Sequence, residues 1–372
     1  MTDAAWIDVG AEAELAKRSL QAVTAGNTPL ALSFQDGRFG AVSNRCNHLG
    51  GPLGEGRMDG EYIVCPWHYW KFHRITGFGE PGYEKDAVPA HEVRVDLGRV
   101  LINKEPFAKR SRLPHPPHEL ARDPARAPGP VRVLGLSTTS MTADHPRYST
   151  SEDLLETALR HANGSQPCET RLLRVRELSF RACEGFYSKS ARACTWPCSI
   201  TTLDANDQME RVYEGLVHWA DVILVATPIR WGAASSLYYK MIERLNCVQN
   251  QITLNNKRLM SNKVAGFIIT GGQDGVQAVA GQMLGFFAEV GCQFPSFPYI
   301  AHTRGWSAED MENNMRHVQN SALLHEGATA LATRCIDTAR LLIGGALGEE
   351  PQSKGGRKGN PLDHRAPSHQ ST

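Results

Sequence analysis

The sequence has 372 residues, with 40 Lys and Arg against 39 Asp and Glu, a formal net charge of +1, and nine cysteines. This length exceeds one ordinary domain, and the balanced charge argues against a nucleic-acid partner or an acidic membrane surface. No apolar run approaches the ~18–20 residues that cross a bilayer, and the N-terminus lacks a secretory pattern. We therefore expect a cytoplasmic protein with reduced cysteines.

The first region, residues 1–103, contains short β-rich runs broken by glycine turns, such as "PLALSFQDGRFGAVSN" and "GEYIVCP". The stretch "VRVD-LG-RVLIN" alternates apolar and polar residues on both sides of a Gly-containing turn, as a β-hairpin does. This region is predicted to be a small all-β domain.

Two further stretches lack a hydrophobic pattern. Residues 104–130 hold seven prolines and show no apolar periodicity, which predicts a semi-extended linker. Residues 346–372 are polar and rich in Gly and Pro, which predicts a disordered tail.

Residues 131–345 alternate between strand and helix patterns. We predict strands at 131–136, 170–178, 221–228 and 263–270, a last strand in "FPSFPYIA", and helices between them, with one long helix over about 308–343. Such alternation predicts a parallel sheet covered on both faces. The expected fold is an α/β doubly wound parallel sheet of the flavodoxin-like type, preceded by the small all-β domain.

The most specific motif pairs a cysteine with a histidine twice. Cys46-x-His48 is followed, after sixteen residues, by Cys65-x-x-His68. Structural zinc sites commonly pair Cys with Cys and His with His, so zinc is the weaker alternative. A two-iron cluster with two thiolates on one iron and two imidazoles on the other fits better. Because neutral imidazoles replace anionic thiolates, such a cluster has a raised reduction potential.

The segments "CNHLG" and "CPWH", followed by "YWKFHRITG", resemble the Rieske 2Fe–2S binding motif, and the similarity covers about residues 6–103. The resemblance implies that Cys46, His48, Cys65 and His68 are the cluster ligands. His73 and His91 fall outside the motif, and we expect both to be ordinary surface or core histidines.

One departure from the Rieske pattern is informative. High-potential Rieske proteins carry an extra cysteine in each loop, where this chain has Gly51 and Trp67. The chain therefore resembles the lower-potential Rieske-type ferredoxins and oxygenase components. Trp67 and Trp70 are expected either to shield the cluster from water or simply to pack in the core.

Three loops follow predicted strands at the edge of the sheet where parallel α/β domains bind ligands. The first, "GLSTTSMTADHPRYSTSED", is rich in hydroxyls and ends at a helix N-terminus, which suits a phosphate monoester, although ordinary N-capping also explains its Ser and Thr. The second, "TPIRWG", offers backbone amides and an indole to a flat ring. The third, "TGGQDG", has glycines that allow the backbone to approach a ligand closely. The dinucleotide fingerprint G-x-G-x-x-G is absent.

With "ADVILVATPIRWGAASSLYYKMIERL", the loops resemble those of NAD(P)H-dependent FMN reductases over about residues 131–300. The resemblance implies FMN as a cofactor and NAD(P)H as co-substrate. It implies phosphate contacts from Ser137, Thr138, Arg147, Ser149 and Thr150, and ring contacts from Thr227, Pro228, Ile229, Arg230, Trp231, Gly232, Gly271, Gly272, Gln273 and Asp274.

A cysteine group follows at Cys183, Cys194 and Cys198. Iron–sulfur flavoproteins of the same family hold a 4Fe–4S cluster here with four closely spaced cysteines. This chain has Phe186 in place of one of them, and Cys168 is the only spare upstream, so we expect a degenerate site. A functional second cluster at Cys183, Cys194 and Cys198 is the alternative. The remaining Cys247, Cys292 and Cys335 are expected to be buried packing residues.

Together these features predict an NAD(P)H-dependent flavin oxidoreductase that passes electrons through FMN to the Rieske cluster and on to an acceptor the sequence does not identify. The alternative is a partner-fed electron carrier or redox sensor that oxidises no nicotinamide. A terminal oxygenase is disfavoured, since no His-x(3–5)-His with an acidic partner follows residue 131. No side-chain set suggests proton-transfer or nucleophilic catalysis, and the resemblance leads us to expect a homo-oligomer.

Overall fold

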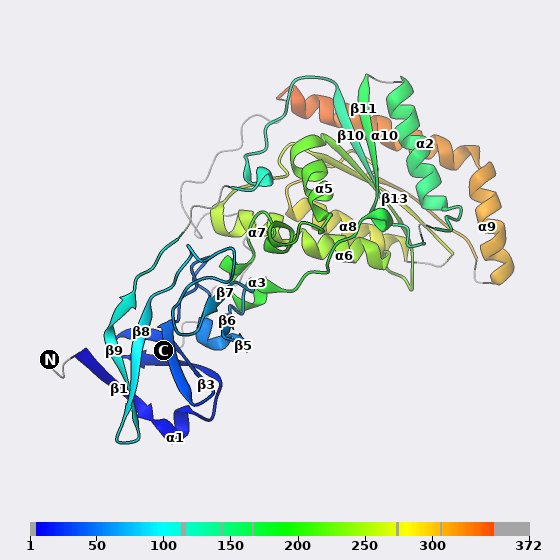
Figure 1. Cartoon of the computed structure of the whole chain (residues 1–372). Helices are drawn as coiled ribbons and strands as arrows, with labels where there is room; N and C mark the ends of the chain where they lie inside the picture. Colours follow the sequence, from blue (N-terminus) through cyan, green and yellow to red (C-terminus); the bar gives the residue numbers. More distant parts are fainter. Residues whose placement is uncertain are drawn as a thin grey trace, which may run out of the picture. The chain divides into compact units, whose positions relative to one another are not determined.

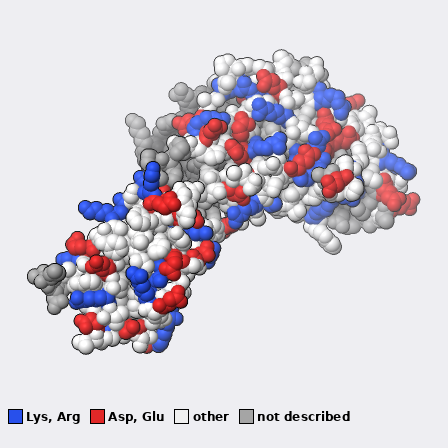
Figure 2. Space-filling view, viewed as in Figure 1, with Lys and Arg blue, Asp and Glu red and all other residues white. Residues whose placement is uncertain are grey.

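The computed structural model describes residues 5–112, 117–142, 144–165, 167–272, 275–305 and 307–345 (Figure 1). Its contacts divide the chain into two compact units, residues 1–117 with 185–193, and residues 118–184 with 194–372. The tail predicted at 346–372 lies outside the described residues. Within the described ranges no helix is long and apolar enough to cross a membrane. Acidic and basic side chains are interspersed on the face seen in Figure 2.

The first unit contains two antiparallel sheets. Its six-stranded sheet has the order β1-β9-β8-β4-β3-β2, and its three-stranded sheet the order β5-β6-β7. The elements are β1 (Trp6–Ala11), α1 (Glu12–Leu15), β2 (Leu20–Ala25), β3 (Thr28–Gln35), β4 (Arg38–Ser43), η2 (Leu53–Glu55), β5 (Arg57–Asp59), β6 (Tyr62–Val64), β7 (Lys71–His73), β8 (Ala90–Asp96), β9 (Arg99–Ala108), α3 (Phe186–Lys189) and η5 (Ala191–Ala193). The predicted β domain is confirmed, while the short α1 was not predicted.

The β8–β9 hairpin has a tight turn of the kind that the sequence pattern predicts. Leu97 and Gly98 have φ values of 48° and 73° and join β8 to β9, with Asp96 opposite Arg99. Positive φ at both central residues defines a type I′ turn, whose twist matches that of the strands. The hairpin predicted here is confirmed, and β9 continues beyond residue 103 to Ala108.

A common core joins the two sheets of the first unit. It includes Ala31 and Val42 from the larger sheet, Phe72 from the smaller one, and the side chains of Cys46 and Cys65. Both cysteines are therefore held by packing on two sheets at once.

The second unit is built on a parallel sheet of order β11-β10-β12-β13-β14. The strands are β10 (Val131–Ser137), β11 (Cys168–Arg174), β12 (Val222–Pro228), β13 (Val264–Gly271) and β14 (Tyr299–Thr303). The helical elements are η3 (Glu119–Ala121), α2 (Thr150–Ser165), η4 (Val175–Glu177), α4 (Ser199–Leu203), α5 (Met209–Tyr213), the π-helical η6 (Glu214–Trp219), α6 (Ser236–Arg244), α7 (Asn246–Asn255), α8 (Val276–Glu289), α9 (Ala308–Asn320) and α10 (Ala322–Ile343). The flavodoxin-like prediction is confirmed.

Side-chain alternation along the central strand places helices on both faces of this sheet. On β12, Val222 and Leu224 pack with α2 and α10, whereas Ile223 and Val225 pack with α5, α6 and α8 (Figure 1). Because successive side chains of a strand point to opposite faces, one apolar run supplies two cores.

Three predicted boundaries were wrong. The second strand spans Cys168–Arg174 and gives way to η4, and the last strand begins at Tyr299, later than predicted. The long helix predicted over 308–343 is two helices, because Ser321 has ψ 96° and its hydroxyl accepts a hydrogen bond from the Leu324 amide. Serine is a preferred N-cap, so it begins α10 rather than continuing α9.

Candidate functional site

The four predicted cluster ligands converge in the first unit. Cys46 and His48 lie in the loop after β4, and Cys65 and His68 lie between β6 and β7. The two Nδ1 atoms of His48 and His68 are 3.0 Å apart, and the two thiols share a hydrogen bond. The nitrogen pair and the sulfur pair are thus gathered separately, as a cluster with two protein ligands on each iron requires. Among the described residues, no three Cys, His, Asp or Glu side chains are grouped around one point where a single metal ion could bind.

The site favours thiolate at Cys65. The hydrogen bond from the Cys46 thiol lowers the pKa of Cys65 against the opposing effect of burial, and the backbone N–H groups of Trp67 and His68 add to this. The same pairing raises the pKa of Cys46. Because a thiolate is the metal-binding form, this environment fits an iron–sulfur cluster.

Glycine makes room for the cluster where a side chain would intrude. A Cβ added at Gly51 would lie 2.7 Å from the Cys65 sulfur and 3.1 Å from the Trp67 ring. Any larger residue at this position would press on the ligands. The position that holds a cysteine in high-potential relatives is therefore packed against Trp67 here.

The two tryptophans of the motif contact different histidines in different ring geometries. The Trp70 ring stacks on His48, with ring centroids 5.0 Å apart and an interplanar angle of 4°. Trp67 packs edge-on toward His68 at 6.4 Å. Each tryptophan therefore contacts the imidazole of one predicted ligand and also packs against the core.

The two histidines outside the motif take structural roles, as predicted. His73 Nδ1 accepts hydrogen bonds from the amides of Ile75 and Thr76 and so closes a turn. His91 is buried and its Nδ1 lies 2.8 Å from the Asn103 carbonyl oxygen.

In the second unit, the three predicted flavin loops meet at the carboxyl ends of β10, β12 and β13. The Ile229 amide donates to the Thr270 carbonyl at 2.8 Å, and the hydroxyls of Thr150 and Thr270 lie 2.7 Å apart. The Thr138 amide donates to the Ala226 carbonyl at 2.9 Å. Loops that are distant in the sequence thus form one continuous edge, the usual ligand position in this fold.

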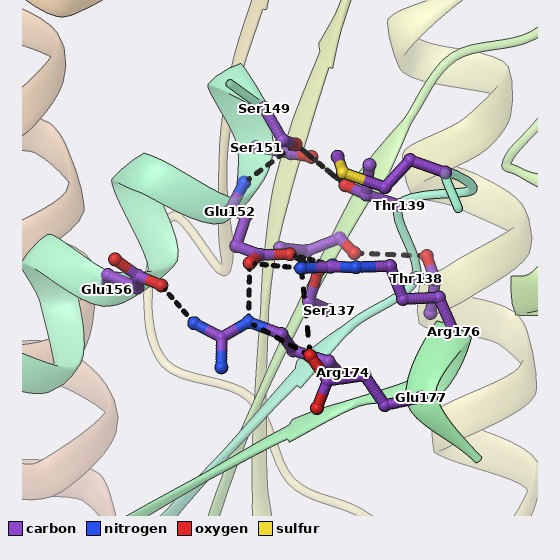
Figure 3. Close-up of polar contacts among 12 residues, drawn as sticks. Ser137, Thr138, Thr139, Ser149, Ser151, Glu152, Glu156, Arg174, Arg176 and Glu177 are labelled. Carbon is purple, nitrogen blue, oxygen red and sulfur yellow. Dashed lines mark hydrogen bonds and ion pairs between the residues drawn. The ribbon is translucent and has the colours of Figure 1, made fainter. Parts of the chain in front are cut away.

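The hydroxyls of the first loop cluster at the start of α2. Thr139 Oγ1 lies 2.7 Å from Ser149 Oγ and 3.2 Å from Ser151 Oγ, and Ser149 caps the Glu152 amide (Figure 3). Thr139 and Ser151 were not among the predicted residues. Their proximity comes from the return of the chain at the helix N-terminus, which the sequence spacing did not reveal.

Ser140 marks the point where this loop has unused hydrogen-bonding capacity. Its Oγ is buried and has no hydrogen-bond partner in the described part of the chain. Buried hydroxyls are normally paired, so this atom fits a loop that receives a polar ligand such as a phosphate. Ser140 was missed by sequence reasoning. By contrast, Thr138 already donates to the Ala226 carbonyl, and the Arg147 side chain is exposed.

Ser137 belongs to a charged network rather than to the hydroxyl cluster. Its hydroxyl donates to Glu152, which also accepts hydrogen bonds from Arg174 and Arg176, while Arg174 pairs with Glu156 (Figure 3). Burial acts to raise the pKa of Glu152, but these three donors outweigh it and lower the value to about 2. The arginine charges are matched by carboxylates, so the network supports the loop instead of offering charge to a phosphate.

The second loop forms a tight turn with an exposed tip. Trp231 and Gly232 have φ values of 51° and 72°, and Arg230 and Ala233 exchange hydrogen bonds across them, which makes a type I′ turn. The Trp231 side chain is 95% exposed, whereas Thr227, Pro228 and Ile229 are buried.

The third loop packs closely on the second. A Cβ added at Gly271 would lie 2.8 Å from the Ile229 Cβ, and one at Gly275 would lie 3.2 Å from the Gly232 Cα. Glycine is therefore required for this approach. Gly272 is described as half-buried, while Gln273 and Asp274 lie outside the described residues.

The cysteine group contains a member that the sequence did not reveal. Burial raises the pKa of Cys194 to about 11, with further contributions from the neighbouring Cys198 and Cys183 thiols. Burial raises the pKa of Cys247, and the nearby Cys198 and Cys194 thiols raise it further. Cys247 lies on α7 and was predicted only to pack. Cys168 opens β11 and packs in the core on the other face of the sheet. The fourth cysteine near this group is therefore Cys247.

Comparison with known proteins finds a family match in each half of the chain. The Rieske [2Fe-2S] domain family matches residues 5–90, and the NADPH-dependent FMN reductase family matches residues 132–306. Ferredoxin CarAc of Metapseudomonas resinovorans is 32% identical over 103 residues, which cover 27% of this chain and 94% of that protein. The ferredoxin component of the naphthalene 1,2-dioxygenase system of Pseudomonas aeruginosa is 29% identical over 98 residues, which cover 26% of this chain and 94% of that protein.

Two matches concern the second half. The 8-demethyl-8-aminoriboflavin-5'-phosphate synthase of Streptomyces davaonensis is 32% identical over 77 residues, covering 20% of this chain and 30% of that protein. The crystal structure of RosB with a bound flavin-phosphate intermediate is 20% identical, covers 57% of this chain and 81% of that one, and gives a TM-score of 0.43. By the family matches, the chain is a redox protein with a Rieske [2Fe-2S] domain at residues 5–90 followed by an NADPH-dependent FMN reductase domain at residues 132–306.

Proposed function

We propose that this protein is an NAD(P)H-dependent flavin oxidoreductase in which electrons pass from NAD(P)H through FMN to the Rieske-type cluster and then to a one-electron acceptor. The observation that carries the proposal is the presence, in one chain, of a ligand set for a two-iron cluster and a three-loop strand edge of the flavodoxin type. Neither site alone requires the other, but together they match two-electron to one-electron conversion.

Bound FMN would take a hydride, hence two electrons, from the nicotinamide and release electrons singly, whereas a Rieske-type cluster takes one. The residues of the chain position and tune these groups. Thr139, Ser140, Ser149 and Ser151 gather hydroxyls at the α2 N-terminus, where the helix dipole favours a phosphate. Thr150, although predicted to contact the phosphate, bonds Thr270 and so ties the first loop to the third.

The cluster end is tuned by its sulfur environment. Backbone N–H groups of Trp67 and His68 donate to Cys65, and that of His48 to Cys46. Hydrogen bonds to sulfur stabilise its negative charge and raise the potential of a cluster. This tuning favours acceptance of electrons from a flavin.

The test is anaerobic mixing of the purified protein with NADPH or NADH, followed by visible and EPR spectroscopy. We expect the flavin absorbance to bleach and a reduced Rieske signal to appear after it. If flavin and cluster are both present but neither responds to either nicotinamide, the reductase proposal is wrong. A carrier reduced by a partner protein, the role suggested by the names of the ferredoxin relatives, would then be the better account.

A further inference from the structure

The chain after β9 forms a strap on the first ligand loop, the one that carries Cys46 and His48. Residues 109–112, here called the strap, follow the end of β9 and belong to the first compact unit. Ser111 forms an antiparallel bridge with Ala87, and the two residues exchange backbone hydrogen bonds of 2.8 and 2.9 Å. This bridge fixes the strap to the β domain.

Asn47 stands between the first two predicted ligands in the sequence and is bonded to the strap. Its Nδ2 donates to the Ser111 carbonyl at 2.7 Å and to the Ala87 carbonyl at 3.1 Å. Its Oδ1 accepts a hydrogen bond from Arg110 Nη1. Asn47 is only 5% exposed, so the strap and its bridge partner satisfy both ends of a buried amide.

Arg110 binds the same loop at two further points. Its Nη2 donates to the Ser43 hydroxyl at 3.0 Å and to the Arg45 carbonyl at 2.9 Å. Next to it, Arg112 Nη2 lies 3.4 Å from the His48 carbonyl oxygen. A guanidinium presents a planar fork of donors, so one side chain holds several points of the loop at once.

The charge of Arg110 is not matched by the groups that it contacts. Its three acceptors, on Asn47, Ser43 and Arg45, are neutral oxygen atoms, and arginine stays protonated at ordinary pH. Pairing with Cys65 and burial raise the pKa of the Cys46 thiol, and the Arg110 guanidinium acts in the opposite direction. The guanidinium therefore favours negative charge on a ligand sulfur.

The second ligand loop, which carries Cys65 and His68, meets a cation in a similar way. Residues 185–193 belong to the first compact unit, although they fall inside the reductase family match at 132–306. Within them, Lys189 Nζ donates to the Pro66 carbonyl. The hydrogen bond from Cys46 is the main cause that lowers the pKa of Cys65, and the Lys189 ammonium lowers it further.

The same nine residues, 185–193, cover His68. The Ala193 carbonyl oxygen lies 2.7 Å from His68 Nε2, and the Phe186 ring meets the His68 ring edge-on, with centroids 5.1 Å apart. As a result His68 is only 1% exposed. Because charges interact more strongly where water is excluded, this cover favours an effect of Lys189 on the ligands.

We propose that Arg110 and Lys189, which both lie outside the ligand motif, are the cations that raise the reduction potential of the cluster, one at each ligand loop. Reduction adds one electron and makes the cluster more negative, so a fixed positive charge nearby stabilises the reduced form. The inference rests on the Rieske-type cluster of the proposed function, but on neither flavin nor nicotinamide.

The test is an anaerobic potentiometric titration of the intact chain with dithionite, in which EPR follows the reduced cluster. In Arg110→Gln and in Lys189→Gln the reduction equilibrium should shift toward the oxidised form by about fivefold or more, because charges near a protein surface act through an effective dielectric constant of about 20. The double variant should shift by the product of the two factors. The matched controls Lys109→Gln and Arg192→Gln remove exposed cations of the same two segments and should stay within about twofold of the wild type.

Two further readouts separate charge from structure. Arg110→Lys and Lys189→Arg keep the positive charge, so both should retain the wild-type potential. Added salt should reduce the difference between the wild type and the two Gln variants, since exposed charges are screened. If the iron-loaded Gln variants keep the wild-type potential, or if the two controls shift it equally, the proposal is wrong.

Variants that fail to bind iron have a substitute. Ser43→Glu replaces Arg110→Gln, because it sets a carboxylate beside the guanidinium, and Lys109→Glu is its control. Ser188→Glu, next in sequence to Lys189, replaces Lys189→Gln. The potential should fall more in Ser43→Glu than in Lys109→Glu, and equal potentials would overturn the role of Arg110.

The proposed function and this inference fail in different experiments. If NADPH and NADH leave the cluster oxidised while dithionite reduces it with the expected shifts among the variants, the proposed function fails and the role of the two cations stands. If nicotinamide reduces the cluster but the Gln variants keep the wild-type potential, the inference fails alone.

Discussion

At the residue scale, the hydrogen-bond partners of a few side chains decide the chemistry of each site. The spacing of the two Cys-His pairs predicts the cluster ligands, and the structure brings the two Nδ1 atoms to 3.0 Å and joins the two thiols by a hydrogen bond. The hydroxyls of the flavin loop were harder to assign, since Ser and Thr also cap helices. Ser137 was predicted to contact phosphate but donates to Glu152, and Ser140 was overlooked although its hydroxyl is buried with no described partner.

Ser140 gives a prediction with opposite effects on folding and binding. In Ser140→Ala a buried, unpartnered hydroxyl is removed, so the free energy of unfolding without flavin should stay equal or rise by about 1 kcal/mol. FMN affinity should fall by roughly tenfold, the loss of one hydrogen bond. Fluorescence titration with FMN and urea unfolding of the flavin-free protein check the two effects. Weaker unfolding stability with unchanged affinity would contradict the assignment.

Glu152 gives a prediction about acid stability. Its folded pKa of about 2 lies below its usual value of 4.5, so its ionised form stabilises the folded state above pH 5, and this stabilisation is lost as pH falls toward 2. The difference corresponds to about 3 kcal/mol. From pH 5 to 2.5, urea unfolding should show a larger loss of stability in the wild type than in Glu152→Gln. Parallel pH profiles would contradict this.

At the element scale, the order and type of strands were predictable because apolar runs with period two or continuous burial have few other causes. The residues at which helices and strands end were not predictable from the sequence. Ser321 divides what reads as one helix, and α3 and η5 have no hydrophobic pattern of their own. Their positions are decided by tertiary contacts, which no local window of sequence contains.

One buried ion pair joins α6 to stretches of chain that precede and follow residues 185–193 in the sequence. Arg244, at the end of α6, bonds Asp207 at 2.8 and 3.0 Å, the Thr201 hydroxyl at 2.7 Å and the Arg181 carbonyl at 2.7 Å. Both charged side chains are fully buried. The pair therefore joins α6 to the chain on both sides of residues 185–193.

Breaking this pair should be costly. Asp207→Asn leaves the guanidinium charge buried without a carboxylate, and we expect the free energy of unfolding of the second unit to fall by about 3–5 kcal/mol. The control is Asp337→Asn, which breaks an exposed pair with Arg340 and should cost less than about 1 kcal/mol. Urea midpoints of β12 amide exchange report this unit. Similar values for both variants would contradict the role of the pair.

At the scale of the whole molecule, the sequence predicted the two fold types correctly, since each has its own periodicity and its own motif. It assigned residues 185–193 to the reductase half by their place in the chain, whereas their contacts assign them to the first unit. Linear order is a weak guide wherever a loop leaves the fold that surrounds it in sequence.

The proposed electron count is a property of the whole chain. Full reduction of FMN and cluster takes three electrons, so anaerobic titration should end at about 1.5 equivalents of NADPH per chain. In Cys65→Ser, which lacks one cluster ligand, the end point should fall to about 1.0 with flavin content unchanged. An end point near 1.0 in the wild type with two irons bound would show that the cluster is not fed by the flavin.

The first unit is discontinuous along the chain, and this limits how the protein can be divided or assembled. A cut in the proline-rich stretch would separate the cluster loops from the nine residues that cover His68. A linear fusion of a separate ferredoxin to a separate flavoprotein would likewise leave the His68 imidazole uncovered, because it lacks the nine covering residues. The two halves are therefore not independent modules. We expect a fragment of residues 1–117 to lack the cover that Phe186 and Ala193 give to the His68 side chain.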